Sequence, residues 1–244
     1  MVQTVMVTGA ASGIGLACTK KLLDKGNRIL AFDPKEEQMR AELPNDEQII
    51  FFGGDVSKPE DCKEAVFQTN KKFGELNALI HWGATHSSKR WDELDAGEFN
   101  FVMSVNVTGS FLISQAAAHY MMNNNGGSIV LTTSTSVLQG VTGGGGQGGP
   151  AYVSSKGAII ALTRSLSRSL APKIRCNAVS PGLTETAMIA GYTEKKRKAM
   201  AERFPMGRFG TAEEIANAGI FLISKKASFI TGEVIQVNGG SNFN

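Results

Sequence analysis

The chain has 244 residues, of which 42% are hydrophobic and 19% charged, and its formal net charge is +3 at pH 7. This length suits one large α/β domain, and so small a charge gives no reason to expect a nucleic acid or an anionic membrane as partner. The three cysteines lie far apart in the sequence, which fits a reducing compartment and offers no metal-ligand spacing. We see no apolar run long enough to span a bilayer and no room for a signal peptide before the first strand, so we expect a cytoplasmic protein.

Short apolar runs rich in β-branched residues alternate with longer segments of helical periodicity along the chain. This alternation predicts a mainly parallel sheet covered by helices on both faces. The expected fold is a single-domain, doubly wound, Rossmann-like, three-layer α/β/α structure over residues 1–244. We expect strands at 4–8, 28–32, 48–52, 76–81, 127–134, 174–180 and 233–237, and helices after residue 15, from about 34, from about 57 to 73, and at 96–122, 152–170 and 211–224.

The first predicted strand leads directly into a glycine-rich turn, Gly9-Ala-Ala-Ser-Gly13-Ile-Gly15, which opens a helix. Glycines allow a tight turn and a close approach to a pyrophosphate, which the N-terminus of the following helix stabilises. A tight strand–helix turn would also use glycines for structural reasons alone. The context of strand, glycines, helix, second strand and acid favours dinucleotide binding.

Asp33 follows the second strand, where a carboxylate can accept hydrogen bonds from both hydroxyls of the adenosine ribose. It would repel the 2′-phosphate of NADP, and Ser12 stands where a basic residue could have contacted that phosphate. The sequence therefore favours NAD over NADP, although Arg28 and Lys35 are nearby cations. Asp33 also precedes Pro34, so capping of the next helix is a second role that is compatible with the first.

Two further polar residues stand where a site could use them. Asp55 follows the third strand and can bond an adenine amino group, although the segment 57–61 also has the pattern of a helix cap. Asn106 lies inside the predicted helix 96–122, where asparagine is disfavoured unless its side chain has a partner. Asn106 is therefore either a structural polar group or part of an active-site network.

The segment 134–156 carries the strongest catalytic signal. Ser134 leaves the fifth strand, a glycine-rich loop follows at 140–149, and Tyr152 and Lys156 open a helix four residues apart, on one helix face. The pKa of tyrosine is ordinarily about 10, and a fixed positive charge beside the phenol lowers it. The pair is a candidate proton donor and acceptor near neutral pH.

Taken together, these motifs resemble the short-chain dehydrogenase/reductase family, and the match covers nearly the whole chain. It implies an NAD(P)-dependent oxidoreductase without a metal, assembled as a homotetramer, with a catalytic tetrad of Asn106, Ser134, Tyr152 and Lys156. The motifs that carry the resemblance are, in the family's order, Thr8–Gly15, Asp55-Val56, Asn106-Val-x-Gly109, Ser134, Tyr152-x-x-x-Lys156 and Pro181-Gly-x-x-x-Thr186.

The family's reaction moves a hydride to or from C4 of nicotinamide and a proton to or from the substrate oxygen. By resemblance, Tyr152 would be the general acid or base, and Lys156 would lower its pKa and bond the nicotinamide ribose. Ser134 would donate a hydrogen bond to the carbonyl oxygen, and Asn106 would hold a water that links Lys156 to solvent. The implied cofactor-binding residues are Gly9, Ser12, Gly13, Ile14, Gly15, Asp33, Asp55, Val56, Gly83, Tyr152, Lys156, Pro181, Gly182, Thr184 and Thr186.

The chain departs from the family's pattern in three places. After the fourth strand, His81-Trp-Gly-Ala84 replaces the usual Asn-Asn-Ala-Gly, and we interpret His81 as a structural replacement rather than a catalyst. Thr133 and Ser136 compete with Ser134, which the alignment on Gly127-Ser-Ile-Val selects. The loop 140–149 is longer than usual, and its glycines predict a mobile loop at the substrate mouth, with a harmless surface insertion as the alternative.

The resemblance places a substrate lid at 183–206. The lid offers apolar side chains for a partly hydrophobic pocket, and its basic run 195–198 has the pattern of a solvated helix face, with recruitment of an acidic substrate as the alternative. We expect an oxidoreductase that acts with NAD(H) on a small-molecule secondary alcohol or ketone. The alternatives are an NADPH-dependent 3-ketoacyl reductase and a non-catalytic cofactor-sensing protein. Candidate residues of the lid and mouth are Met188, Ile189, Tyr192, Phe204, Met206, His86, Trp91 and Gln139.

Overall fold

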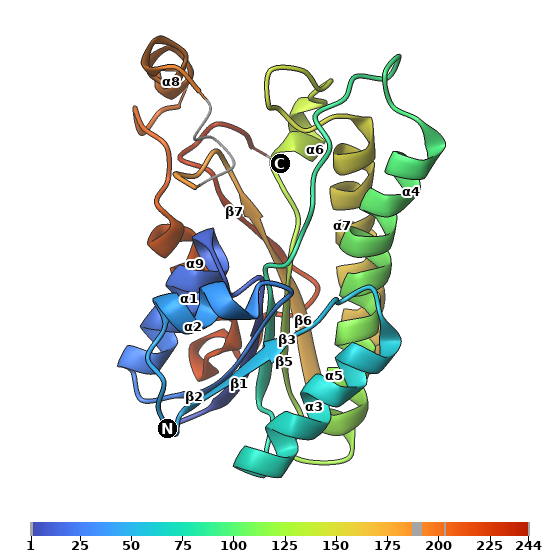
Figure 1. Cartoon of the computed structure of the whole chain (residues 1–244), viewed down its shortest axis with the longest axis vertical. Coiled ribbons are helices and arrows are strands. Elements are labelled where there is room, and N and C mark those ends of the chain that lie inside the picture. Colours follow the sequence, from blue (N-terminus) through green and yellow to red (C-terminus); the bar gives the residue numbers. More distant parts are fainter. Residues whose placement is uncertain (1, 187–191, 203, 244) are drawn as a thin grey trace.

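The computed structural model describes residues 2–186, 192–202 and 204–243 (Figure 1). Within them, parallel strands form one seven-stranded sheet in the order β3-β2-β1-β4-β5-β6-β7, which confirms the predicted doubly wound parallel fold. The strands are β1 Thr4–Thr8, β2 Arg28–Asp33, β3 Ile49–Gly53, β4 Ala78–His81, β5 Gly127–Thr132, β6 Ile174–Pro181 and β7 Val234–Val237.

Helices cover both faces of the sheet, so its strands are buried apolar runs (Figure 1). One face packs against α1 Gly13–Asp24, α2 Glu36–Glu42 and α9 Ala212–Ile223. The other packs against α3 Pro59–Phe73, α5 Gly109–Met122 and α7 Pro150–Leu170. Three further helices are α4 Ala96–Met103, α6 Ser136–Gln139 and α8 Glu194–Ala201.

The predicted elements are present, with shifted ends that matter for the site. β5 ends at Thr132 rather than at residue 134, so Ser134 lies in the segment beyond the sheet. The predicted helix 152–170 already begins at Pro150, because proline at the first helical position loses no intrahelical hydrogen bond. The predicted helix 96–122 contains a π-helical turn at Ser104–Thr108, and Asn106 lies in that turn. Such turns are rare and often mark functional sites.

The helix Ala96–Met122 also corrects our expectation that no apolar run could span a bilayer. With 27 residues, this helix is long and apolar enough to cross a bilayer, judged by length and composition alone. Among the described residues, one helix meets this criterion. However, it packs against α3 and α7 and buries polar residues such as Asn106 and Ser114. That is the environment of a core helix.

Trp82, which departs from the family's pattern, has its own packing partner. The indole is 8% exposed and lies against α9, where a Cβ atom at Gly219 would come within 2.7 Å of Cζ2. The large side chain of Trp82 therefore fits against α9 because Gly219 has no side chain.

Candidate active site

The predicted site residues meet at the carboxyl ends of the strands, as expected for a doubly wound sheet. A cavity of about 200 Å³ lies there, and it brings together residues that are distant in the sequence. The predicted residues that line it are Ile14, Ser134, Tyr152, Lys156, Pro181, Gly182, Thr184 and Thr186, together with Gln139 and Tyr192 from the predicted mouth and lid. Part of each predicted set thus lines one cavity. The other predicted residues are not among its lining residues: Asn106 of the catalytic set, and Gly9, Ser12, Gly13, Gly15, Asp33, Asp55, Val56 and Gly83 of the cofactor set.

The contacts of the competing hydroxyls favour Ser134 as the catalytic serine. Ser134 lines the cavity with Tyr152, and its hydroxyl acts to lower the pKa of the Tyr152 phenol. Thr133 is engaged elsewhere, because its hydroxyl donates to the Lys156 carbonyl at 2.7 Å. Ser136 lines the cavity, but its buried Oγ forms no hydrogen bond with the described residues.

Lys156 is 3% exposed, and its ammonium donates a hydrogen bond to the Thr132 carbonyl at 2.9 Å. The ammonium lies 5.7 Å from the centroid of the Tyr152 ring. Burial lowers the pKa of Lys156 from 10.5 to about 8, because desolvation disfavours the charged form. The lysine thus titrates close to the physiological range.

The pKa of Tyr152 differs from our expectation in direction. We expected the charge of Lys156 to lower it, but burial raises the pKa of the phenol, and the Ser134 hydroxyl only partly opposes this effect. Desolvation is the largest cause, because a tyrosinate would be poorly solvated in the cavity.

Asn106 ties three segments together through its side chain. Its Oδ1 accepts from the Thr85 amide at 2.8 Å, and its Nδ2 donates to the Thr85 carbonyl at 2.8 Å and to Ser155 Oγ at 2.9 Å. Ser155 lies between Tyr152 and Lys156 on α7 and donates to the Tyr152 carbonyl. Asn106 therefore has the partners that a buried asparagine needs, and they position α7.

The glycine turn has the shape that a pyrophosphate requires. Gly9 and Gly13 have φ of 68° and 52°, in the left-handed region that glycine tolerates best. A Cβ atom at Gly15 would lie 2.1 Å from the Gly9 carbonyl oxygen, so this cradle of Gly9, Gly13 and Gly15 admits only glycine at position 15. α1 begins at Gly13, and its first turn therefore presents free amides to this edge of the sheet.

Asp33 lies beside this turn, with Oδ2 accepting from the Ala11 amide at 3.3 Å and Oδ1 from the Lys35 amide at 3.0 Å. The N-cap of α2 is Lys35, so Asp33 forms a local turn before the helix rather than capping it directly. Asp55 shows the structural alternative more strongly, because its Oδ1 accepts from both the amide and the hydroxyl of Ser57 at 2.8 Å.

His81 is buried and linked to the start of the glycine turn. Its Nδ1 lies 2.6 Å from the Thr8 hydroxyl oxygen, which also accepts from the Gly83 amide at 3.2 Å. Burial lowers the pKa of His81 to about 3, and the charge of Lys156 adds to this effect. The imidazole is therefore neutral, which agrees with a structural role.

The loop 140–149 lies at the cavity and is held by hydrogen bonds, while its mobility stays a prediction. The amides of Gly144 and Gly149 donate to the carbonyls of Ser88 and Ser87 at 2.6 and 2.8 Å. On the opposite side, the Lys196 ammonium donates to the Gly145 carbonyl at 2.7 Å. The loop therefore has a defined path between two other segments.

The predicted lid is only partly described. Met188 and Ile189 lie outside the described residues, whereas Tyr192 lines the cavity and packs with Phe204 and Phe209. Met206 and Trp91, at 62% and 80% exposure, do not line the cavity. The ring of His86 contacts the Tyr152 ring edge to face, with centroids 6.2 Å apart.

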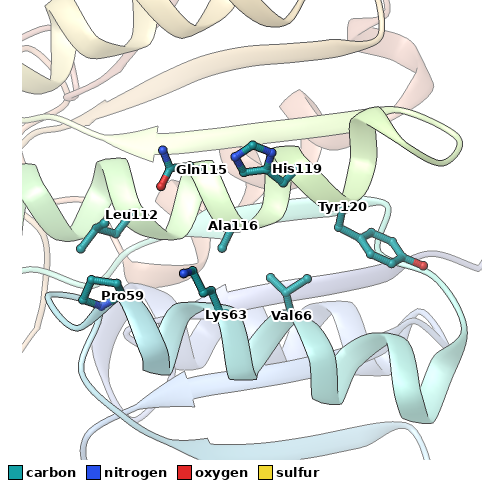
Figure 2. A pocket seen from close by; sticks show the side chains of 8 residues that line it. All are labelled: Pro59, Lys63, Val66, Leu112, Gln115, Ala116, His119 and Tyr120. Atoms are coloured by element: carbon teal, nitrogen blue, oxygen red, sulfur yellow. The ribbon is translucent and has the colours of Figure 1, made fainter.

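A second groove lies between α3 and α5, away from the carboxyl edge of the sheet (Figure 2). It contains none of the predicted catalytic or cofactor residues. Its lining residues are Pro59, Lys63, Val66, Leu112, Gln115, Ala116, His119 and Tyr120.

Comparisons with known proteins agree with this geometry. A family model described as enoyl-(acyl carrier protein) reductase matches residues 9–242. The 3α-hydroxysteroid dehydrogenase of Mediterraneibacter gnavus is 33% identical over 98% of this chain and 96% of its own. The chain belongs to the short-chain dehydrogenase/reductase family.

Solved structures of short-chain dehydrogenases/reductases have the same fold. A member from Brucella melitensis named glucose/ribitol dehydrogenase has a TM-score of 0.92 at 31% identity, covering 99% of this chain and 97% of that one. The 3-ketoacyl-(acyl-carrier-protein) reductase of the same organism, solved with NADH, has a TM-score of 0.88 at 27% identity, over 99% and 98% of the two chains. Because these likenesses extend over almost the entire chain, the family's whole fold is present here.

Sequence reasoning missed several residues that hold this dehydrogenase/reductase site together. Thr132 accepts the hydrogen bond of Lys156, Thr8 contacts His81, and Ser155 links Asn106 to α7. These small hydroxyl residues carry no sequence signal of their own, because their roles depend on which strands become neighbours.

The buried lysine predicts a pH dependence of stability. Its folded-state pKa of about 8 lies below the ordinary 10.5, so between these values the folded chain binds fewer protons than the unfolded chain. Stability conferred by this group therefore rises with pH across that window, by about 3 kcal/mol at most. We expect the free energy of unfolding of the wild type, minus that of Lys156→Met, to rise from pH 8 to 10.5 in urea titrations of the cofactor-free protein. A difference that stays constant across this window would contradict the burial of a titrating ammonium.

Proposed function

We propose that this protein is an NAD(H)-dependent oxidoreductase that interconverts a secondary alcohol and a ketone. The observation that carries the proposal is the placing of Ser134, Tyr152 and the buried Lys156 on one cavity, which also reaches the glycine turn through Ile14. A proton-transfer group and a dinucleotide cradle at one cavity are what hydride transfer coupled to proton transfer requires.

The residues present fit a nicotinamide dinucleotide. The cradle at Gly9, Gly13 and Gly15 and the free amides of α1 would hold the pyrophosphate, and Asp33 would accept from the adenosine ribose. The bound cofactor would supply or accept the hydride. In the reduction direction, Tyr152 donates the proton to the carbonyl oxygen while Ser134 donates a hydrogen bond to it. Lys156 stabilises the tyrosinate that results, and Asn106 positions α7 through Ser155.

Two alternatives receive less support. The first alternative is an NADPH-dependent 3-ketoacyl reductase. One structural neighbour is named a 3-ketoacyl reductase, but it was solved with NADH, and Asp33 opposes the 2′-phosphate of NADPH. A non-catalytic cofactor sensor would have no need of Ser134, Tyr152 and the buried Lys156 on one cavity.

We also propose the family's homotetramer. The exposed phenylalanines Phe101 and Phe111 on the α4–α5 helix, and Phe229 and Phe243 near the C-terminus, are candidates for subunit contacts. The light-scattering mass of the native protein is expected to equal four chains, and a mass of one chain would contradict the assembly.

Tyr152→Phe tests the catalytic assignment, because it removes the proton and keeps the ring. We expect kcat/KM to fall by about 10²–10⁴ on a panel of secondary alcohols and ketones followed by NADH absorbance, while the Kd of NADH changes little. Tyr120→Phe is the matched control, since that hydroxyl donates to Asn70 Oδ1 and to the Gly74 carbonyl at the C-terminal end of α3, and Tyr120 does not line the catalytic cavity. Full activity in Tyr152→Phe would eliminate the proposed role.

Asp33→Ala tests the cofactor assignment by direct binding. We expect the wild type to bind NADH at least about tenfold more tightly than NADPH, because Asp33 repels the 2′-phosphate. The ratio of the two Kd values, measured by fluorescence, should fall in Asp33→Ala. Asp24→Ala, which removes an equal charge from the exposed end of α1, should leave it unchanged. A wild type that prefers NADPH would refute the NAD assignment.

A further inference from the structure

Two segments that are remote in sequence approach each other over the catalytic cavity. Gly146, Gln147 and Gly148 of the loop line one wall, and Tyr192 and Met200 line the wall that faces them. If the proposed function holds, a substrate bound against Tyr152 lies between these two walls.

The walls touch at two adjacent points. The Lys196 ammonium donates to the Gly145 carbonyl at 2.7 Å and lies 3.7 Å from the centroid of the Tyr192 ring. Next to it, Gly146 packs so closely that a Cβ atom there would lie 3.2 Å from Cε1 of Tyr192. A charge-assisted hydrogen bond and a cation–π contact thus join α8, the loop and the Tyr192 ring.

Lys196 differs from the other residues of its basic run. Lys195 and Lys198 are exposed, as a solvated helix face predicts, and Arg197 forms an ion pair with Glu185. Lys196 alone of these four contacts the glycine loop among the contacts of the described residues. The run is therefore a solvated face with one side chain turned inward.

The loop is shaped for this contact by backbone packing on its other side. Gly143 and Gly149 leave no room for a side chain, since a Cβ atom would lie 2.7 and 2.0 Å from the Lys89 carbonyl oxygen. The four residues Gly143–Gly146 all have positive φ, between 55° and 88°. Glycine is thus required here by close approach and left-handed backbone, and the loop presents the Gly145 carbonyl at a fixed place.

We propose that Lys196, Tyr192 and Gly143–Gly146 form a clasp across the mouth of the catalytic cavity, and that this clasp selects substrates by size. The proposal rests on the proposed function for the identity of the substrate, a secondary alcohol or ketone. Compounds that fit beneath the closed clasp react readily, whereas bulky ones require the Lys196–Gly145 contact to break first. Lys196 and Gly146 are then residues that determine specificity without touching the reacting atoms.

Lys196→Met tests the clasp, because methionine keeps much of the chain length and removes the donor, with Lys195→Met as the matched control. Hydrogen–deuterium exchange at the amides of residues 143–149 should increase about threefold or more in Lys196→Met and stay at the wild-type rate in Lys195→Met. Across ketones of increasing size, the ratio of kcat/KM for bulky to small compounds should rise about fivefold or more in Lys196→Met alone, with kcat for the smallest ketone unchanged.

A second pair of variants separates the clasp from general loop damage. Gly146→Ala and Gly140→Ala both place alanine in a left-handed conformation, at φ of 81° and 58°. Only the Cβ atom at position 146 meets Tyr192, because nothing lies within 4 Å of one at position 140. Gly146→Ala should therefore change the substrate ratio as Lys196→Met does, and Gly140→Ala should not.

Unchanged exchange in Lys196→Met would overturn the contact, and equal substrate ratios in Lys196→Met and Lys195→Met would overturn the selection by size. A wild-type chain that converts no alcohol or ketone would refute the proposed function and, with it, the selection of substrates by size. The exchange data would still decide whether the clasp exists, so the two failures are distinguishable.

Discussion

The cavity edge of this protein depends on the burial of one ammonium group. Lys156 lies almost entirely out of solvent, and a backbone carbonyl, that of Thr132, accepts its hydrogen bond. A buried charge is costly unless polar groups solvate it, and here the cost appears as a pKa lowered to about 8. The end of β5 is therefore held both by the lysine and by its pairing with β6.

From that carbonyl, a chain of hydrogen bonds runs across three strand ends. The Thr132 hydroxyl donates to the His81 carbonyl at 2.6 Å, and the His81 ring contacts the Thr8 hydroxyl, which accepts from Gly83. Thr8 is the last residue before the glycine turn. The proposed proton-transfer end and the proposed cofactor end of the cavity are thus linked by one network. A neutral imidazole suits the centre of this network, because a second positive charge would lie near Lys156.

The sequence predicts most of this architecture because its signals are local. Buried runs mark the strands, and the glycine turn and the Tyr152–Lys156 spacing are read directly from neighbouring residues. The π-helical turn at Asn106 cannot be read from neighbouring residues. The partners of Asn106, Thr85 and Ser155, are 21 and 49 residues away. The contacts of the glycine loop cannot be read from the sequence for the same reason, because the carbonyls of Ser87, Ser88 and Lys89 against which it packs lie in a distant segment.

The direction of the Tyr152 pKa shift was also not predicted from neighbouring residues in the sequence, and it constrains the chemistry. A phenol whose pKa is raised by burial is protonated at neutral pH, which makes it ready to donate a proton. Reduction of a carbonyl uses that proton directly. Oxidation of an alcohol needs the tyrosinate, and the charge available to stabilise it is the Lys156 ammonium, 5.7 Å from the ring centroid. That ammonium loses its own proton above a pH of about 8. The proposed reduction therefore needs a protonated Tyr152, whereas the proposed oxidation needs the Tyr152 tyrosinate beside a charged Lys156.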